Sequence, residues 1–325
     1  MVLLNTFNRS YLEYDSFIAT NFQLFFRFEI SLIIFNICHT LFFLYINITA
    51  KQFHQNWTNV MSILYIQHCI ADIAWIIDRS ILISQHPDDH QVLMKICSYV
   101  RVICIFQGLL VLPILIIERC FATIYISDYE STKRLYISYS LVGSLFCFGC
   151  IASIGFHECK LHLMLFNSVL LFNTLGILGN FYLLYKNRQY YQQFQRGQRN
   201  CNLTERFQIS ENIKICKLVN MIVLTMGSFN GLICFTILID FLNLSDYHRT
   251  VYTLMFDVSA ILYSTIFPYI CMYYSVKWKY RFKQIFHCSP TNRVDPKVEL
   301  HDTFGSVMTE CTSDAYFADI RKSWK

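Results

Sequence analysis

The sequence predicts an all-α protein, a seven-transmembrane helix bundle followed by a short amphipathic eighth helix. Three observations lead to this fold class. The 325 residues are 54% hydrophobic and only 15% charged, whereas soluble domains carry about a quarter charged residues. Seven separate stretches are mostly apolar over about 20 residues, the length that a helix needs to cross the hydrocarbon layer. With 10 Gly and 5 Pro, the chain also has too few turn-forming residues for a large β-barrel.

Each apolar stretch is expected to be a helix, because unpaired backbone N–H and C=O groups find no water in lipid. Helices buried in a large soluble protein would have polar faces, which these stretches lack. Four of the stretches contain no Asp, Glu, Lys or Arg. The expected spans are residues 30–48, 60–83, 96–117, 135–156, 161–185, 218–239 and 251–276.

Lysine and arginine are distributed unevenly over the segments that connect the spans. If the N-terminus lies outside, the inner segments carry 20 basic residues and the outer segments carry 5. Because cytoplasmic loops are enriched in Lys and Arg, we expect the N-terminus outside and the C-terminus in the cytoplasm. The basic residues are scattered between apolar runs and form no stripe with interleaved aromatics, so nucleic acid is not an expected partner. No cofactor is expected either.

The spans divide the chain into three parts. Residues 1–27 form an extracellular N-terminal segment, and residues 28–288 hold the seven spans and an amphipathic helix. Residues 289–325 are polar and lack apolar periodicity, which is typical of a disordered cytoplasmic tail. The N-terminal segment has no compact apolar core and no small-residue cleavage site, so we expect the first span to act as its own insertion signal.

Beyond the seventh span, apolar residues recur at helical spacing among three lysines and an arginine within residues 277–287. The apolar residues are Trp278, Phe282, Ile285 and Phe286. This pattern predicts an amphipathic helix along the inner membrane surface. Two modification sites accompany the topology. Cys288, just beyond this helix, is a palmitoylation candidate, and Asn8 heads a sequon on the outer side and is a glycosylation candidate.

Five charged residues lie within the predicted spans. Asp72, Asp78 and Arg79 belong to the second span, Arg101 to the third and Asp257 to the seventh. Charges in the membrane are costly, so they face the bundle interior and find partners. Since neighbouring spans are antiparallel, we expect Asp78 and Arg101 at similar depth, with Asp257 at a comparable depth. Two interpretations stay open: a polar ligand pocket open to the outside, or structural ion pairs that stabilise the bundle.

The outer side contains two further features. Cys97 and Cys159 both face an oxidising compartment in which disulfides persist, and a bridge would tie the loop 156–162 to the third span. The alternative is two free thiols. His86 and His90 are four residues apart in the first outer loop, a spacing that a metal could use. The loop context favours a solvated polar loop, so no metal site is expected.

On the inner side, Glu118 and Arg119 end the third span. An acid beside an arginine can form a local pair that a partner or a conformational change breaks. The helical spacing of apolar residues in 209–216 predicts that the sixth helix extends into the cytoplasm, and its basic face would contact a partner protein or anionic headgroups. The basic residues of this extension are Arg206, Lys214 and Lys217.

Two runs of residues carry a family resemblance. They are residues 118–130, ERCFATIYISDYE, and residues 203–213, LTERFQISENI. Both resemble the nematode serpentine chemoreceptors of the Sre (class epsilon) family, and the similarity of layout extends over residues 25–290. The resemblance implies a multi-pass receptor in the plasma membrane of a sensory neuron. Such a receptor senses an external small molecule and signals to a heterotrimeric G protein, with Arg119 and the basic face of the sixth helix carrying the coupling.

The chain departs from the rhodopsin-like pattern, because Cys120 replaces an aromatic residue after Glu-Arg and Pro268-Tyr269 lacks the preceding asparagine of Asn-Pro-x-x-Tyr. A ligand-gated channel or transporter is the alternative function, although no internal repeat or pair of broken spans is evident. A seven-span zinc hydrolase is a weaker alternative. Its metal site would need several His and acidic ligands at one depth, and only His39 and His68 lie within spans and away from a span end.

Overall fold

The structure of the chain is a computed structural model. The described residues are 16–50, 54–83, 90–126, 129, 134–159, 161–196, 209–210, 212–222, 225, 229 and 246–286. The chain forms two compact units, Met1–Lys283 and Gln284–Lys325, and residues 284–286 are the described part of the second. The predicted sites Asn8, Arg206 and Cys288 lie outside the described residues.

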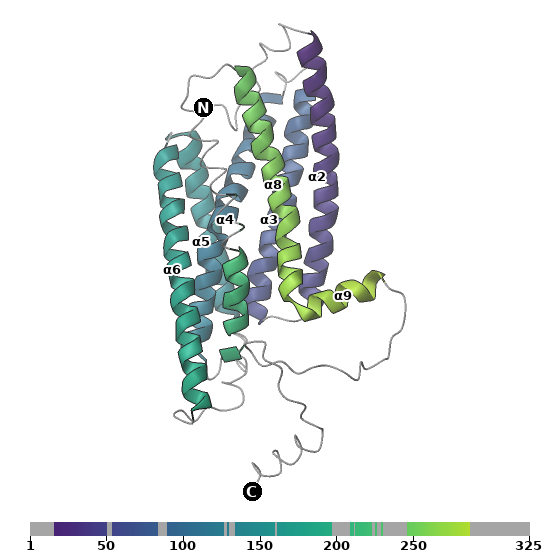
Figure 1. The fold of residues 1–325 in the computed structure, drawn as a ribbon. Coiled ribbons are helices and arrows are strands. Elements are labelled where there is room, and N and C mark those ends of the chain that lie inside the picture. Colours follow the sequence, from purple (N-terminus) through teal and green to yellow (C-terminus); the bar gives the residue numbers. More distant parts are fainter. Residues whose placement is uncertain are drawn as a thin grey trace. The chain divides into compact units, whose positions relative to one another are not determined.

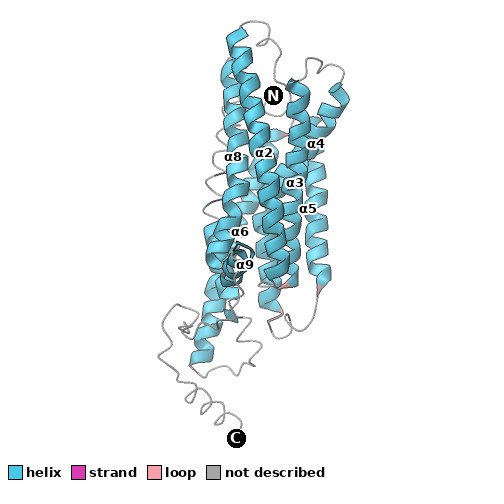
Figure 2. Cartoon of the chain, turned by 90° about the vertical axis from the view of Figure 1, so that its right-hand side faces the viewer, coloured by secondary structure: helices cyan, strands magenta, loops and turns pink. Residues whose placement is uncertain are grey.

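All regular secondary structure in the described residues is helical, which confirms the predicted all-α class (Figures 1 and 2). Between α6 and α8, residues 209–210, 212–222, 225 and 229 are also helical. They belong to the predicted cytoplasmic extension and the first half of the sixth span. The named helices are α2 (Ser16–Ala50), α3 (Gln55–Ile83), α4 (Gln91–Ile124), α5 (Leu135–His157), α6 (His162–Gln195), α8 (Asp246–Tyr274) and α9 (Val276–Phe286).

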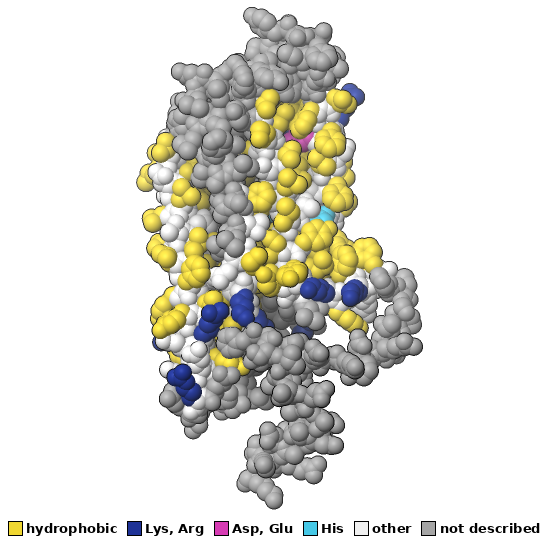
Figure 3. All heavy atoms as spheres, in the orientation of Figure 1, with side chains coloured by type: hydrophobic (Ala, Val, Ile, Leu, Met, Phe, Trp, Pro, Cys, Tyr) yellow, Lys and Arg dark blue, Asp and Glu magenta, His cyan; other side chains and the backbone are white. Residues whose placement is uncertain are grey.

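Six helices in the described residues are long and apolar enough to cross a membrane, namely α2, α3, α4, α5, α6 and α8. They correspond to the predicted spans one to five and seven, and most of the sixth span lies outside the described residues. On the face drawn in Figure 3, apolar side chains cover the flanks of the helices, whereas Lys and Arg gather mainly towards the lower end of the view, from α6 across to α9. This is the distribution expected when lipid surrounds the helices and water covers their ends.

The helices extend beyond the predicted apolar stretches, and the difference is largest at the start of α2. This helix begins at Ser16, whereas the predicted first span begins at residue 30. Backbone hydrogen bonding continues a helix outside lipid whatever the polarity of its side chains. The apolar stretch therefore marks the membrane part of a helix and not its end. Glu29, just outside the predicted span, is fully buried within the bundle.

The predicted amphipathic helix is present as α9. Ser275 caps it, because its hydroxyl oxygen accepts a hydrogen bond of 3.0 Å from the backbone N–H of Trp278. The Trp278 side chain is 1% exposed and its ring lies 6.2 Å from that of Phe43 on α2. Lys277, on the other face, is exposed. The helix therefore packs Trp278 against α2 and presents Lys277 outward, while Ile285 and Phe286 are exposed.

Helix α4 packs closely against two neighbours, and polar residues make this possible in a membrane. Pro113 has no N–H, so the carbonyl of Leu109, four residues earlier, loses its helical partner. The side-chain amide of Asn173 on α6 donates to that carbonyl at 2.9 Å. On α5, a Cβ at Gly149 would lie 3.0 Å from Cγ of Gln107. Glycine there lets the α4 and α5 backbones approach each other, as small residues do between membrane helices.

Candidate functional site

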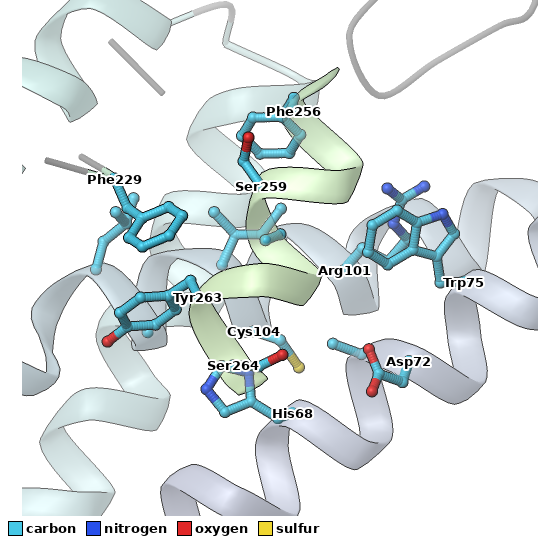
Figure 4. A pocket seen from close by; sticks show the side chains of 15 residues that line it. His68, Asp72, Trp75, Arg101, Cys104, Phe229, Phe256, Ser259, Tyr263 and Ser264 are labelled. Atoms are coloured by element: carbon cyan, nitrogen blue, oxygen red, sulfur yellow. The ribbon is translucent and has the colours of Figure 1, made fainter. Parts of the chain in front are cut away.

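A cavity of about 110 Å³ lies between α3, α4, α8 and the helical stretch that contains Phe229 (Figure 4). Its wall is mostly apolar, and its polar residues come from all three named helices. The lining residues are His68, Ala71, Asp72, Trp75, Arg101, Cys104, Ile105, Gly108, Leu109, Phe229, Phe256, Ser259, Ala260, Tyr263 and Ser264. An apolar cavity with a few converging polar groups is the usual form of a small-molecule site.

Asp72 is the acidic group of the cavity wall, and neutral residues hold it in place. Its Oδ2 accepts a hydrogen bond of 2.7 Å from the side-chain amide of Asn36 on α2. The hydroxyl of Ser264 on α8 donates to Oδ1 of the same asparagine at 2.8 Å. Asp72 is 5% exposed. Among the described residues, no Lys or Arg forms an ion pair with it.

Three further polar groups of the cavity wall lack hydrogen-bond partners within the described part of the chain. They are Nε2 of His68, Nε1 of Trp75 and the hydroxyl of Tyr263, all of them buried. The rings of His68 and Tyr263 lie 6.3 Å apart. Because buried polar groups in folded proteins are nearly always hydrogen-bonded, unpartnered groups around one cavity indicate a site for a polar occupant.

A network of buried ion pairs adjoins the cavity. Arg79 of α3 pairs with Glu29 of α2 at 2.8 Å and also with Asp257 of α8. Arg101 of α4 pairs with Asp78 at 3.3 Å and with Asp257 at 3.4 Å. The network thus joins four helices through charge.

The five predicted membrane charges therefore divide into two groups. Asp72 and Arg101 line the cavity, while Asp78, Arg79 and Asp257 lie in the ion-pair network with Arg101 as the shared member. The guanidinium of Arg101 also stacks 4.7 Å from the ring of Trp75. The structure thus contains a feature that corresponds to each interpretation. The cavity corresponds to the ligand pocket, and the adjoining ion-pair network corresponds to the structural ion pairs.

At the other end of α4, Glu118 and Arg119 form the local pair that their adjacency suggests. Nη2 of Arg119 donates to Oε1 of Glu118 at 2.6 Å, and both side chains are at most 1% exposed. The hydroxyl of Tyr129 also donates to Oε1 of Glu118, at 2.6 Å. It accepts in turn from the amide of Asn56 on α3 at 3.0 Å. Burial and, secondly, Glu118 raise the pKa of Tyr129, so its hydroxyl stays a neutral donor.

Arg119 also reaches the extension of the sixth helix. Its Nη1 donates to Oδ1 of Asn212 at 3.3 Å. Asn212 donates in turn to Asn187 of α6 and to Thr123 of α4, each at 3.4 Å. Lys214, two residues further along, is exposed, and Lys217 is partly buried. The direct partner of Arg119 on this segment is therefore the neutral amide of Asn212.

The predicted bridge between Cys97 and Cys159 does not form in the structure, where both are free thiols. Cys97 is buried and Cys159 is exposed. The loop between α5 and α6 is attached to α4 by other side chains. Glu158 accepts a hydrogen bond from the hydroxyl of Tyr99 and pairs with Lys95 at 3.5 Å. These polar contacts hold the loop without a covalent link.

Sequence reasoning missed four polar residues of these sites. Glu29 could have been found, because an acid directly before an apolar run lies within reach of the membrane. Asn36 follows it by seven residues and so lies on the same helical face. Asn212 and Tyr263 carry no charge and gave no comparable signal. In the described residues, no group of three or more His, Cys, Asp or Glu could hold a metal ion. His86 and the three residues between it and His90 lie outside the described residues.

Comparison with known proteins gives consistent matches. A family model described as "Sre G protein-coupled chemoreceptor" matches residues 73–325. Serpentine receptor class epsilon-12 of Caenorhabditis elegans is 30% identical over 341 residues, covering 100% of this chain and 99% of that protein. Serpentine receptor class epsilon-13 of the same organism is 26% identical, covering 98% of this chain and 95% of the relative. The family model begins just after Asp72, and all three matches extend over the Glu118–Arg119 pair.

Proposed function

The chain belongs to the Sre family of G protein-coupled chemoreceptors, and we propose that it senses an external small molecule in the Asp72 cavity and signals to a heterotrimeric G protein. The observation that carries this proposal is the position of the two sites on one helix. Arg101 at the cavity and Arg119 at the second cluster both belong to α4. At 1.5 Å per residue they are about 27 Å apart along the helix axis.

The mechanism that we propose is a shift between two populated states. A ligand that binds one arrangement of α3, α4 and α8 better than another favours that arrangement. At the far end of α4, the contact of Arg119 with Asn212 is a 3.3 Å hydrogen bond to a neutral amide. The pair of Arg119 with Glu118 joins two charges at 2.6 Å. Both bonds use the charged guanidinium, but only the shorter one has an ionised partner on each side, so the link to the sixth helix is the weaker of the two. We propose that it breaks first and frees that helix to move.

The topology belongs to the same proposal. The excess of Lys and Arg in alternate segments supports an N-terminus outside and a C-terminus in the cytoplasm, with the receptor in the plasma membrane of a sensory neuron. Lys214 and Lys217 would then lie on the cytoplasmic side together with Arg206, where a G protein docks. Glycosylation of Asn8 and palmitoylation of Cys288 are consistent with the same orientation.

The test of this proposal needs no ligand. Asn212→Ala removes the acceptor that holds Arg119 to the sixth helix, and we expect it to raise basal G-protein signalling in a cell reporter assay. Met221→Ala, an exposed position of the same helical stretch, is the matched control and should leave the basal signal unchanged. Surface expression of each variant is measured in the same cells. Equal basal signals from both variants, at equal expression, would contradict the proposal.

A further inference from the structure

We propose that the ligand is a small amine whose ammonium group binds Asp72 and whose apolar part fills the cavity. This inference rests on the proposed function, in which that cavity is the ligand site. It names the chemical class of the ligand, and it follows from the pairing of the charges, the hydrogen-bond groups in the wall and the size of the cavity.

The charges of the bundle leave one acid without a cation. Among the described acidic side chains in the bundle, Glu29, Asp78, Glu118 and Asp257 each form an ion pair with an arginine. Asp72 forms none, and its one hydrogen bond in the described structure comes from the neutral amide of Asn36. A buried charge without a partner is costly. A ligand that brings its own positive charge removes this cost.

The arginine in the cavity wall does not provide a binding site for an acidic ligand. Arg101 already pairs with Asp78 and Asp257 and stacks on Trp75. A carboxylate ligand would have to displace one of those acids, and it would lie in the same cavity as Asp72 with no unpaired cation to meet it. Like charges in a desolvated site repel strongly. The cavity therefore disfavours ligands that carry a carboxylate.

Two side chains of α3 can accept hydrogen bonds from an ammonium. Asp72 supplies a carboxylate oxygen, and His68, one helical turn away on the same face of α3, supplies Nε2 in the tautomer that carries its proton on Nδ1. Tyr263 of α8 lies beyond His68, with its ring 6.3 Å from the His68 ring, and its hydroxyl is directed away from Asp72 (Figure 4). Nε1 of Trp75 is a donor only, so it does not take part.

The apolar wall sets the size of the rest of the ligand. Phe229, Phe256 and Leu109 supply the hydrocarbon surface beside the polar groups. The cavity of about 110 Å³ is somewhat smaller than a dry cavity of about 150 Å³ that takes up benzene in another protein. It therefore fits one ring or a short branched alkyl chain attached to the amine.

Matched probes test the proposal on the purified full-length receptor in lipid nanodiscs. Benzylamine, benzyl alcohol and benzoate share one ring and differ in the polar group, and isobutylamine with isobutanol repeats the contrast on an alkyl chain. We expect the amines to raise the melting temperature and the alcohols and benzoate to leave it unchanged. Asp72→Asn should weaken amine binding about 30-fold or more, since truncating one partner of a buried charge pair has that order of effect. Glu158→Gln, which removes an exposed acid remote from the cavity, should leave amine binding unchanged.

A second pair of variants keeps the test decisive if Asp72→Asn does not fold. A Cβ at Gly108, in the cavity wall, or at Gly143, on the exposed face of α5, meets nothing within 4 Å. Gly108→Val should abolish amine stabilisation because it fills the cavity, and Gly143→Val should retain it.

Three results would overturn the proposal: stabilisation by an alcohol or by benzoate at equal concentration, no stabilisation by either amine, or, without any amine, stabilisation by sodium relative to potassium that equals the effect of the amines at the same ionic strength. The basal signal of Asn212→Ala tests receptor function separately. Amine binding can therefore fail while the proposed signalling role stands, and the two failures are distinguishable.

Discussion

The clusters around Arg101 and Arg119 lie on the same helix and hold the neighbouring helices by different means. Around Arg101 the ion pairs run between helices, with Glu29 on α2 and Asp257 on α8. At Arg119 the ion pair stays within α4, to Glu118, and the links to other elements are hydrogen bonds in which at least one partner is an uncharged amide or phenol. The helices at the Arg101 end are therefore joined by ion pairs, and those at the Arg119 end by hydrogen bonds that involve the amides of Asn56 and Asn212 and the phenol of Tyr129.

This difference determines which end can move. Removing one partner of a buried ion pair leaves a charge in a low dielectric and costs about 3–5 kcal/mol. A hydrogen bond that joins a charged and an uncharged group contributes about 1.5–3 kcal/mol, and one between two uncharged groups about 0.5–1.5 kcal/mol. Helices at the Arg119 end can therefore separate at a smaller cost while those at the Arg101 end stay together. In the function that we propose, a ligand at the fixed end favours opening of the other end.

The largest expected effect is at Arg79. Arg79→Met removes the cation that pairs with Glu29 and Asp257 and leaves both acids in the bundle, so we expect a loss of about 3–5 kcal/mol. The melting temperature of the purified protein and its surface expression measure this loss. Lys95→Met is the matched control, because the Lys95 side chain is 68% exposed, and it should change little. Equal stability of the two variants would remove the basis for treating the Arg101 end as fixed.

An intermediate effect is expected at Glu118. Glu118→Gln keeps the size of the side chain but removes the charge that pairs with Arg119 and accepts from Tyr129. Breaking a buried ion pair costs about 3–5 kcal/mol, but the Gln oxygen can still accept from Arg119 and only one charge loses its partner. The melting temperature should therefore fall by less than in Arg79→Met, which takes the cation from two acids. Basal signalling should rise, because Arg119 is held less firmly. A loss of stability as large as that of Arg79→Met would show that the two ends do not differ as we propose.

A smaller effect is expected at Tyr129. Tyr129→Phe removes one hydroxyl, which donates to the Glu118 carboxylate and accepts from Asn56. It should cost about 1.5 kcal/mol, the lower end of the range for a hydrogen bond to a charged group, because the ion pair between Arg119 and Glu118 remains. Since its raised pKa keeps the hydroxyl protonated, this cost should not vary with pH near neutrality. Tyr136→Phe, at a 62% exposed position, serves as the control. Melting curves at two neutral pH values measure both points, and a pH-dependent difference would contradict the assignment.

The sequence was sufficient to predict the helices and some of the residues in the clusters around Arg101 and Arg119. A bilayer dictates the length and apolarity of a span, so hydropathy alone located six of the helices in the described part. Because charges in lipid must find partners, the sequence predicted Arg101 and Asp257 at comparable depth, and the structure pairs them. The helical spacing around Trp278 likewise located α9, because an interfacial helix must separate its apolar and basic residues.

The remaining contacts depend on geometry that local patterns do not encode. Asn212 and Asn36 are neutral, so no electrostatic cost marked them, and their roles come from the elements that they face. Cys97 and Cys159 share one side of the predicted topology, but a disulfide needs Cβ atoms within a narrow range of separation. In the structure, Glu158 and Tyr99 make the contact between the loop and α4 instead.

The smallest expected effect concerns Glu158, an exposed acid in the loop beyond α5. The hydrogen bond from Tyr99 and, secondly, Lys95 lower the pKa of Glu158 below its ordinary value of 4.5. Its contribution to stability is therefore complete above 4.5 and is lost as the pH falls through the lower pKa of the folded state. Glu158→Gln cannot ionise, so its melting temperature should lie slightly below that of the unmodified protein at about pH 7 and the difference should shrink under acid conditions. A difference that persists in acid, or that exceeds the effect of Tyr129→Phe, would mean that burial does not set the strength of these interactions, and the contrast between the two ends of α4 would lose its physical basis.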